Sequence, residues 1–155
     1  MFGRKPTKIL APVAGSTVPL SQVKDAAFST ELLGKGLAIK PTANKLVSPI
    51  NGRMSHVFKT GHAATIQSDD GIEILIHIGI NTVELNGANF KTFVSSGQQV
   101  KVGDPIIEFD REKITAAGYD TIIPILVVNH EEFKNLTFNT GMTVQPGTEI
   151  MTVKK

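Results

Sequence analysis

This chain offers four histidines for chemistry at neutral pH and no cysteine: His56, His62, His77 and His130. Two of them, His62 and His77, lie 15 positions apart on either side of an acidic turn, Asp69-Asp70-Gly71. The flanking segments, 60–68 and 72–78, have the composition of two strands joined by a hairpin. The sequence therefore predicts that the two imidazoles lie on neighbouring antiparallel strands.

The length of the turn decides how close the two imidazoles come. If Asp69 and Asp70 form a two-residue loop, His62 stands directly opposite His77, with Cβ atoms about 5 Å apart. If the loop is shifted by one residue, His62 is the diagonal neighbour of His77 on the same face. A three-residue loop would put the two histidines on opposite faces of the hairpin. A paired site therefore requires a two-residue loop under this interpretation.

Alternation along the second strand favours a common face for the chemistry. Its alternate isoleucines would point into a core, which leaves Glu73, Leu75 and His77 on the other face. On the first strand, Thr60 shares a face with His62. The Thr60 hydroxyl can hydrogen-bond one imidazole nitrogen and fix the tautomer of His62.

Paired imidazoles support two kinds of chemistry. Neutral imidazole is a good nucleophile towards phosphorus, and the second ring can donate a hydrogen bond to phosphoryl oxygens as charge develops. Two histidines on adjacent strands can also ligate zinc, but no third or fourth ligand stands at a telling spacing. His56 and His130 have no partner in the sequence and are interpreted as surface residues.

The elements that must position these residues are short strands punctuated by Gly, Pro, Asn and Asp. Helical periodicity is weak. The pattern predicts an all-β fold, an antiparallel β-sandwich of the duplicated barrel-sandwich type, with a few short helical turns. Strands are expected at 8–11, 16–19, 36–41, 45–48, 52–57, 63–68, 72–78, 99–102, 104–109, 121–128 and 148–153, and helical turns at 28–33, 82–85 and 111–118.

Two internal repeats support a duplicated architecture. The pattern G-x-x-V-x-x-G-x-x-I begins at Gly97 and again at Gly141, and Ala11-Pro12-Val13-Ala14-Gly15 is echoed by Ser48-Pro49-Ile50-Asn51-Gly52. Each unit has the form of a strand, a glycine-containing turn and a second strand. Two copies of each kind favour a compact sandwich over a solenoid, which needs more copies.

Length and composition predict one domain over residues 1–155, with about residues 1–6 flexible. Hydrophobic residues make up 41% of the chain, and the formal net charge is +2. No run of Lys and Arg marks a nucleic-acid surface. The basic start leads into no apolar stretch, and no apolar run is long enough to span a bilayer. We expect a cytoplasmic protein that binds no nucleic acid.

One segment carries a resemblance to a known family. The residues Glu73-Ile74-Leu75-Ile76-His77-Ile78-Gly79-Ile80-Asn81-Thr82-Val83-Glu84-Leu85-Asn86-Gly87 resemble the phosphohistidine signature of the glucose-type enzyme IIA component of the bacterial phosphoenolpyruvate-dependent sugar phosphotransferase system. Lys59-Thr60-Gly61-His62-Ala63 resembles the second active-site segment of that family. Further segments match in family order: 10–15, 33–39, 47–52, 97–100 and 103–104.

The resemblance implies a phosphotransferase with a phosphohistidine intermediate and no cofactor. His77 would accept phosphate at Nε2 from the phosphocarrier protein HPr and donate it to a cysteine of a IIB domain. The carbonyl of Gly79 would hold Nδ1 of His77, His62 would hydrogen-bond the phosphoryl group, and Thr60 would orient His62. The protein would meet the membrane only through the permease, and adventitious zinc bridging the two histidines would not make it a metalloenzyme.

The resemblance also implies a docking surface around the two histidines. Phe58 and Leu75 would belong to an apolar patch that suits transient partners. The family usually has aspartate where this chain has Lys35 and Asn81, and both carboxylates belong to a docking rim. Because rim charges mainly set association rate and partner choice, we expect the chemistry of His77 to survive and the partner to differ.

Three other functions remain open at the level of sequence. The first is a regulatory module of the same fold that binds target proteins according to phosphorylation without efficient onward transfer. The second is a biotinyl or lipoyl carrier, which needs a lysine beside a methionine on a hairpin tip, whereas Met142 and Met151 have no adjacent lysine. The third is a zinc hydrolase, which would require stoichiometric metal.

Overall fold

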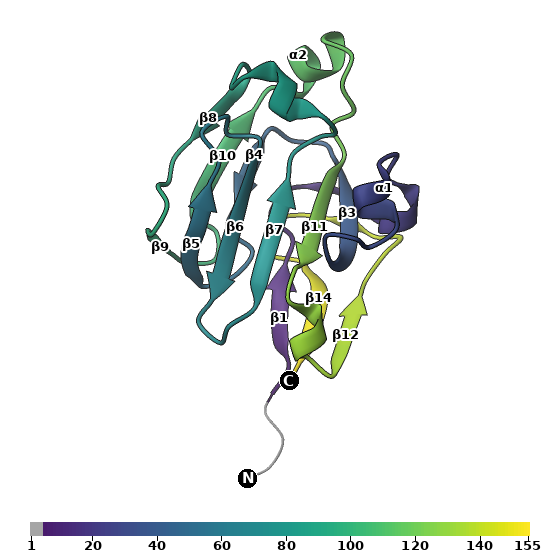
Figure 1. Cartoon of the computed structure of the whole chain (residues 1–155), viewed down its shortest axis with the longest axis vertical. Coiled ribbons are helices and arrows are strands. Elements are labelled where there is room, and N and C mark those ends of the chain that lie inside the picture. The colour runs from purple at the N-terminus through teal and green to yellow at the C-terminus, as the bar shows by residue number, and fades with distance from the viewer. Residues whose placement is uncertain (1–4) are drawn as a thin grey trace.

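The computed structural model describes residues 5–155, in which fourteen strands form three antiparallel sheets (Figure 1). The largest has eight strands in the order β13-β2-β3-β11-β7-β6-β5-β9, and two three-stranded sheets have the orders β1-β14-β12 and β4-β10-β8. The strands of the large sheet are β2 (Gly15–Pro19), β3 (Lys35–Pro41), β5 (Gly52–Val57), β6 (Ala63–Ser68), β7 (Glu73–His77), β9 (Gln99–Val100), β11 (Ile123–Val127) and β13 (Thr143–Val144). The small sheets contain β1 (Thr7–Leu10), β4 (Lys45–Val47), β8 (Phe90–Thr92), β10 (Pro105–Phe109), β12 (Asn135–Phe138) and β14 (Glu149–Lys154).

The helical content is small, as predicted. Two α-helices, α1 (Ala26–Ser29) and α2 (Arg111–Ala116), begin at aspartate N-caps, and three 3-10 turns complete the elements: η1 (Leu20–Gln22), η2 (Thr82–Leu85) and η3 (His130–Glu132). The turn predicted at 82–85 is η2, whereas α1 begins two residues before the turn predicted at 28–33. The antiparallel, mostly β architecture confirms the predicted fold class. The strands β8, β12 and β13 were not predicted.

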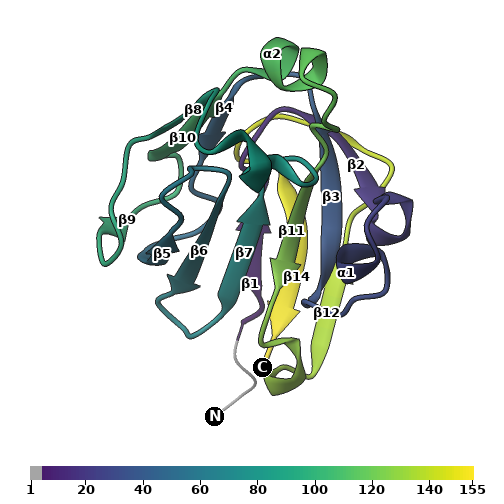
Figure 2. The same cartoon turned by 45° about the horizontal axis from the view of Figure 1, so that its top comes forward.

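The core lies between the large sheet and the two small ones (Figure 2). The alternate isoleucines of β7 and its flanks, at positions 72, 74, 76 and 78, are fully buried, as alternation predicts. A second, smaller apolar cluster covers the other face of β3 and β11, where Phe28 of α1 packs with Leu126 and Ile122. The large sheet is therefore covered on both faces near β11.

The sequence repeats correspond to equivalent pieces of structure. Gly97 and Gly141 have positive φ angles of 91° and 75°, and each is followed by a short strand, β9 or β13. The repeated valines, Val100 and Val144, are buried, and β9 pairs with β5 as β13 pairs with β2. One repeat of each type therefore forms a pair of strands, and the fold contains two equivalent pairs, β13 with β2 and β9 with β5.

Both ends of the described chain lie together, away from the end of β7. β1 pairs with β14 along its length, with Thr7 opposite Val153. Figure 1 shows the C-terminus and the start of β1 at the bottom of the molecule, whereas β7 runs upward to His77. The flexibility expected for residues 1–6 stays a prediction, because residues 1–4 lie outside the described residues.

Candidate phosphohistidine site

The hairpin that carries the two histidines differs from the predicted register. Gln67 pairs with Glu73 and Ala63 with His77, which leaves a three-residue loop of Asp69, Asp70 and Gly71. Gly71 closes the loop with a φ of 92°, a conformation that glycine adopts without steric cost. The prediction that a two-residue loop sets His62 opposite His77 is therefore wrong, and regular alternation would separate the two side chains.

The imidazoles nevertheless meet, because His62 lies just outside β6. The turn before it contains Gly61 with a φ of 71°, so the alternation of β6 does not extend to position 62. The rings of His62 and His77 have centroids 5.0 Å apart and an interplanar angle of 79°. The turn sits closely on β8, since a Cβ at Gly61 would lie 2.9 Å from Cβ of Phe90. The turn at Gly61 and the end of β7 therefore bring the two imidazoles together.

The tautomer of His77 is fixed by its backbone partner. Nδ1 of His77 lies 2.6 Å from the carbonyl oxygen of Gly79. A carbonyl oxygen can only accept, so Nδ1 carries the proton and donates it, and Nε2 keeps a free lone pair. The resemblance to glucose-type enzyme IIA predicted this contact, and the structure contains it.

His62 is held on its far side by a hydroxyl. The Thr60 hydroxyl is hydrogen-bonded to Nδ1 of His62, and the His62 side chain is 5% exposed. When the hydroxyl donates to Nδ1, the His62 proton resides on Nε2 and is available to a ligand at the face shared with His77. The predicted group of Thr60, His62, His77 and Gly79 is therefore assembled in one place.

Both imidazoles are tuned towards the neutral form. Burial, followed by the nearby His77 ring, lowers the pKa of His62 from 6.5 to about 4. Burial also lowers the pKa of His77, although the hydrogen bond to Gly79 and the carboxylate of Asp25 act in the opposite direction. A neutral His77 is the form that can act as a nucleophile.

Aromatic and apolar side chains surround the pair. Phe58 lies 5.3 Å from the His62 ring and 4.5 Å from the His56 ring, and Phe28 lies 5.1 Å from the His77 ring. Leu75, two residues before His77 on the same face of β7, is half-buried. Phe28 and Asp25 were not among the predicted site residues. Both belong to the α1 region, whose distance from His77 in the sequence gave no signal of their approach.

The two predicted rim residues are placed differently. Asn81 follows the Gly79 turn with a φ of 61°, a conformation that asparagine tolerates better than most residues, so its position has a structural reason. Lys35 begins β3 and lines a hollow with Glu31, His130 and Glu131. The structure does not bring Lys35 to the two histidines, and docking roles for Lys35 and Asn81 remain predictions.

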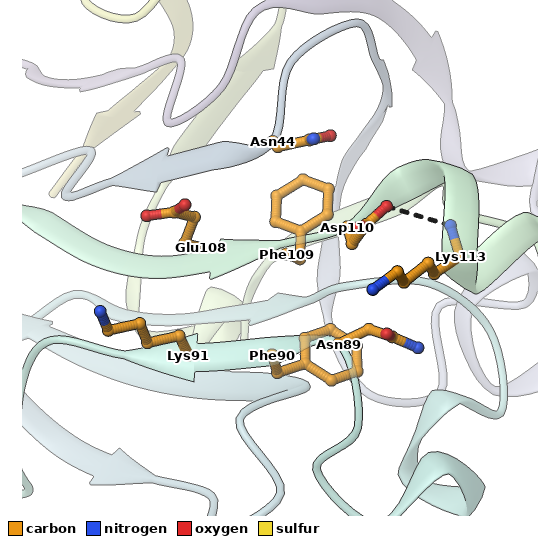
Figure 3. Close-up of a pocket in the computed structure, with 8 residues that line it drawn as sticks. All are labelled: Asn44, Asn89, Phe90, Lys91, Glu108, Phe109, Asp110 and Lys113. Atoms are coloured by element: carbon orange, nitrogen blue, oxygen red, sulfur yellow. Dashed lines mark hydrogen bonds between the residues drawn. The ribbon is translucent and has the colours of Figure 1, made fainter.

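A separate pocket of about 400 Å³ lies over β4, β8 and β10 (Figure 3). Figure 3 shows the rings of Phe90 and Phe109 with lysine, asparagine and acidic side chains around them, and Asp110 accepting a hydrogen bond from the backbone nitrogen of Lys113. None of the predicted site residues lines this pocket. The two histidines therefore lie outside this pocket.

Comparison with known proteins decides the family. Residues 7–133 match the family model for the phosphoenolpyruvate-dependent sugar phosphotransferase system, EIIA 1. This chain belongs to that family. It is therefore a phosphoryl carrier of sugar uptake, with phosphorylation on a histidine, as the resemblance implied.

Relatives of EIIA 1 include free and fused forms. The glucose-specific EIIA component of Buchnera aphidicola subsp. Baizongia pistaciae is 41% identical over 147 residues, covering 95% of this chain and 88% of the relative. The β-glucoside-specific EIIBCA component of Bacillus subtilis is 45% identical over 138 residues, which are 89% of this chain and 23% of that protein. The chain thus spans about a quarter of the length of this fused relative.

A solved structure agrees with the EIIA 1 assignment. The glucose permease IIA from Mycoplasma capricolum superposes with a TM-score of 0.88 at 32% identity, covering 98% of both chains. In residues 5–155 we find no helix with the length and apolar character to cross a membrane. Nor do those residues contain three or more His, Cys, Asp or Glu side chains grouped closely enough to hold a metal ion.

The lowered pKa of His62 predicts a pH dependence of stability. Between pH 6.5 and about 4 the unfolded chain binds a proton at position 62 that the folded chain does not bind, so stability falls as pH decreases through this window. At 1.36 kcal/mol per pKa unit the loss is about 1–3 kcal/mol. The measurement is urea unfolding of wild type and His62→Gln at pH 7.0, 5.5 and 4.5. The wild type should lose its advantage over the variant on acidification; a difference that stays constant with pH contradicts the prediction.

The Gly79 turn predicts a second effect on stability. A Cβ at Gly79 would lie 2.5 Å from Cγ2 of Thr82 and 2.7 Å from the carbonyl oxygen of Asp120, at a φ of 79°. We expect Gly79→Ala to cost about 3 kcal/mol of unfolding free energy through overpacking and strain. Gly103→Ala is the matched control, because Gly103 has a φ of 89° and nothing within 4 Å. The control should lose only about 1 kcal/mol in the same urea titration, and equal losses for the two variants would refute the role of close packing at Gly79.

Proposed function

We propose that His77 is the phosphorylated residue and that its Nε2 is the acceptor atom. The observation that carries the proposal is the hydrogen bond of 2.6 Å from Nδ1 of His77 to the carbonyl of Gly79, which leaves Nε2 as the nucleophile. In the first step Nε2 forms a bond to phosphorus while the bond between phosphorus and the donor atom of phospho-HPr breaks. In the second step a cysteine thiolate of a IIB domain attacks phosphorus, and the bond between Nε2 and phosphorus breaks.

His62 stabilises the phosphoryl group on His77 for its transfer to the IIB domain. With Nδ1 occupied by the Thr60 hydroxyl, Nε2–H of His62 is directed to the face that His77 shares. A donor placed where charge develops is most effective in a partly desolvated site, and His62 is buried. Thr60 thereby acts on the reaction through the orientation of His62.

The partners follow from the family and from the surface. HPr as donor and a IIB domain as acceptor agree with the family, and one relative is named as an EIIBCA component, which combines the parts in one protein. The half-buried side chains of Phe58 and Leu75 beside the histidines provide an apolar contact area. We place the chain in the cytoplasm, where it would reach the membrane only through its permease partner. No choice of sugar follows from its residues.

The test is phosphorylation with purified HPr, enzyme I and phosphoenolpyruvate, followed by tandem mass spectrometry under conditions that preserve phosphohistidine. The expected result is one phosphoryl group on His77 and its loss when a IIB domain is added. A phosphoryl group on His62, His56 or His130 instead would refute the assignment. A stable phospho-His77 that no IIB domain discharges would support a regulatory module instead.

A further inference from the structure

The carbonyl that holds His77 belongs to a short loop between β7 and η2. The peptide group joining Ile78 to Gly79 is fixed at both ends. Its N–H, on Gly79, donates to the carbonyl of Ile122 at 3.0 Å, and its carbonyl, on Ile78, accepts from the hydroxyl of Thr82. This peptide is joined at Cα of Gly79 to the peptide group that carries the Gly79 carbonyl. A change in its orientation is therefore expected to turn that carbonyl relative to His77.

Thr82 is built into the loop through both branches of its side chain. It is fully buried, and its hydroxyl crosses the loop to Ile78. Its Cγ2 methyl occupies the place where a side chain on Gly79 would begin, 2.5 Å from an ideal Cβ there. The hydroxyl therefore contacts Ile78, and the methyl contacts Gly79, the residue whose carbonyl accepts from His77.

The loop is also supported from a distant segment of the chain. The N–H of Ile80 donates to the carbonyl of Asp120, and the carboxylate of Asp120 accepts from the N–H of Ile122. These hydrogen bonds of residues 120–122 would remain in a variant that lacks the Thr82 hydroxyl. Removal of the hydroxyl is therefore expected to loosen the orientation of one peptide without unfolding the loop.

We propose that Thr82 is a positioning residue for phosphoryl transfer, whose hydroxyl keeps the Gly79 carbonyl aimed at Nδ1 of His77 and so keeps Nε2 free of a proton. The inference rests on the proposed function, in which Nε2 is the acceptor. An imidazole without a fixed acceptor at Nδ1 can carry its proton on either nitrogen, and the tautomer protonated at Nε2 has no lone pair there for phosphorus. Thr82 touches neither imidazole and acts only through the loop.

The first arm of the test measures the tautomer directly and uses no partner protein. Wild type, Thr82→Val and Thr82→Ser are labelled with ¹⁵N-histidine, and long-range ¹H–¹⁵N spectra at pH 7.5 report which nitrogen of His77 carries the proton. Wild type and Thr82→Ser should show one tautomer, protonated at Nδ1. Thr82→Val, which keeps the shape but lacks the hydroxyl, should show a measurable population protonated at Nε2; a tautomer identical to wild type would overturn the proposal.

The second arm measures phosphate acceptance from phospho-HPr as a function of HPr concentration. We expect Thr82→Val to lower kcat about tenfold, as loss of an orienting outer contact commonly does, with KM unchanged. Thr82→Ser should restore kcat, and Thr115→Val, at an exposed position on α2, should match wild type. A change confined to KM, or a serine variant as slow as the valine variant, would overturn the role of the hydroxyl. If Thr82→Val does not fold, Thr82→Ala removes the same hydroxyl and is judged by the same two readouts.

The two arms separate this inference from the proposed function. If wild type accepts no phosphate at His77, the proposed function fails, whereas the tautomer measurement still decides whether Thr82 holds the Gly79 carbonyl. If wild type is phosphorylated on His77 and the tautomer of Thr82→Val is unchanged, only the inference on Thr82 fails.

Discussion

His77→Ala is expected to abolish phosphate acceptance. The substitution removes the atom that would bond to phosphorus, and His62 cannot replace it, because its Nδ1 is engaged by Thr60 and its Nε2 carries the proton in the arrangement proposed. The loss should exceed about 1000-fold, as is common when a covalent nucleophile is deleted. The measurement is incorporation of radioactive phosphate from phospho-HPr in a single turnover.

The matched control for this variant is His130→Ala. His130 lies in η3 and lines a hollow away from the two imidazoles, so its removal should leave incorporation at the wild-type level. Unfolding must be measured for both variants, because His77 packs against Phe28 and bonds to Gly79. Incorporation by folded His77→Ala at the wild-type rate would show that phosphate resides elsewhere.

His62→Gln is expected to separate acceptance of phosphate from its donation. The variant retains His77 and its bond to Gly79, so it should still be phosphorylated by phospho-HPr. Transfer onward should fall about 100-fold, the usual cost of losing one donor that stabilises developing charge. The reason is geometric: glutamine has no ring to extend from the Thr60 hydroxyl across to the face of His77.

Onward transfer is measured by discharge of the phosphorylated variant with a purified IIB domain. His130→Gln is the control for the same chemical change at a remote histidine, and should discharge at the wild-type rate. Thr60→Val should lie between wild type and His62→Gln, since it leaves the ring in place but removes the hydroxyl that orients it. Discharge of phosphorylated His62→Gln at the wild-type rate would remove His62 from the proposed reaction.

The architecture could be read from local patterns to a large extent. The strands β5 and β6 have the predicted ends, and the burial of the β7 isoleucines follows from alternation alone. The repeats that begin at Gly97 and Gly141 predicted two equivalent turns, which the glycines form with positive φ angles. These features depend on residues near one another in the chain, where composition is informative.

The site could be predicted only in part, because turns broke the simple geometry. The hairpin loop contains Gly71 as a third residue, which shifts the register by one and should have separated the histidines. A second turn at Gly61 compensates for that shift by taking His62 out of the alternation. The two imidazoles are neighbours, as predicted, but the Gly61 turn brings them together and not a two-residue hairpin loop.

Contacts between segments that are distant in the chain could not be predicted from the sequence. α1 lies close to His77 because β3 and β11 place the segment that contains Asp25 and Phe28 beside β7. No periodicity in the sequence predicts this contact. The position of Lys35, in contrast, follows from alternation along β3, which places it on the same face as the buried Leu37. Leu126 lies on the opposite, outer face of the sheet. The pairing position of Lys35 could have been inferred only once the neighbouring strands were known.

The common location of β1 and β14, away from the end of β7, has a consequence for tethering. A linker attached at either end would leave the histidine face unobstructed and free to turn between a donor and an acceptor. Covalent attachment to a permease would then raise the effective concentration of the carrier beside its acceptor without changing any contact at His77. The same fold could thus serve as a diffusing carrier or as an arm on a larger protein, with linker length setting the rate at which it meets its partner.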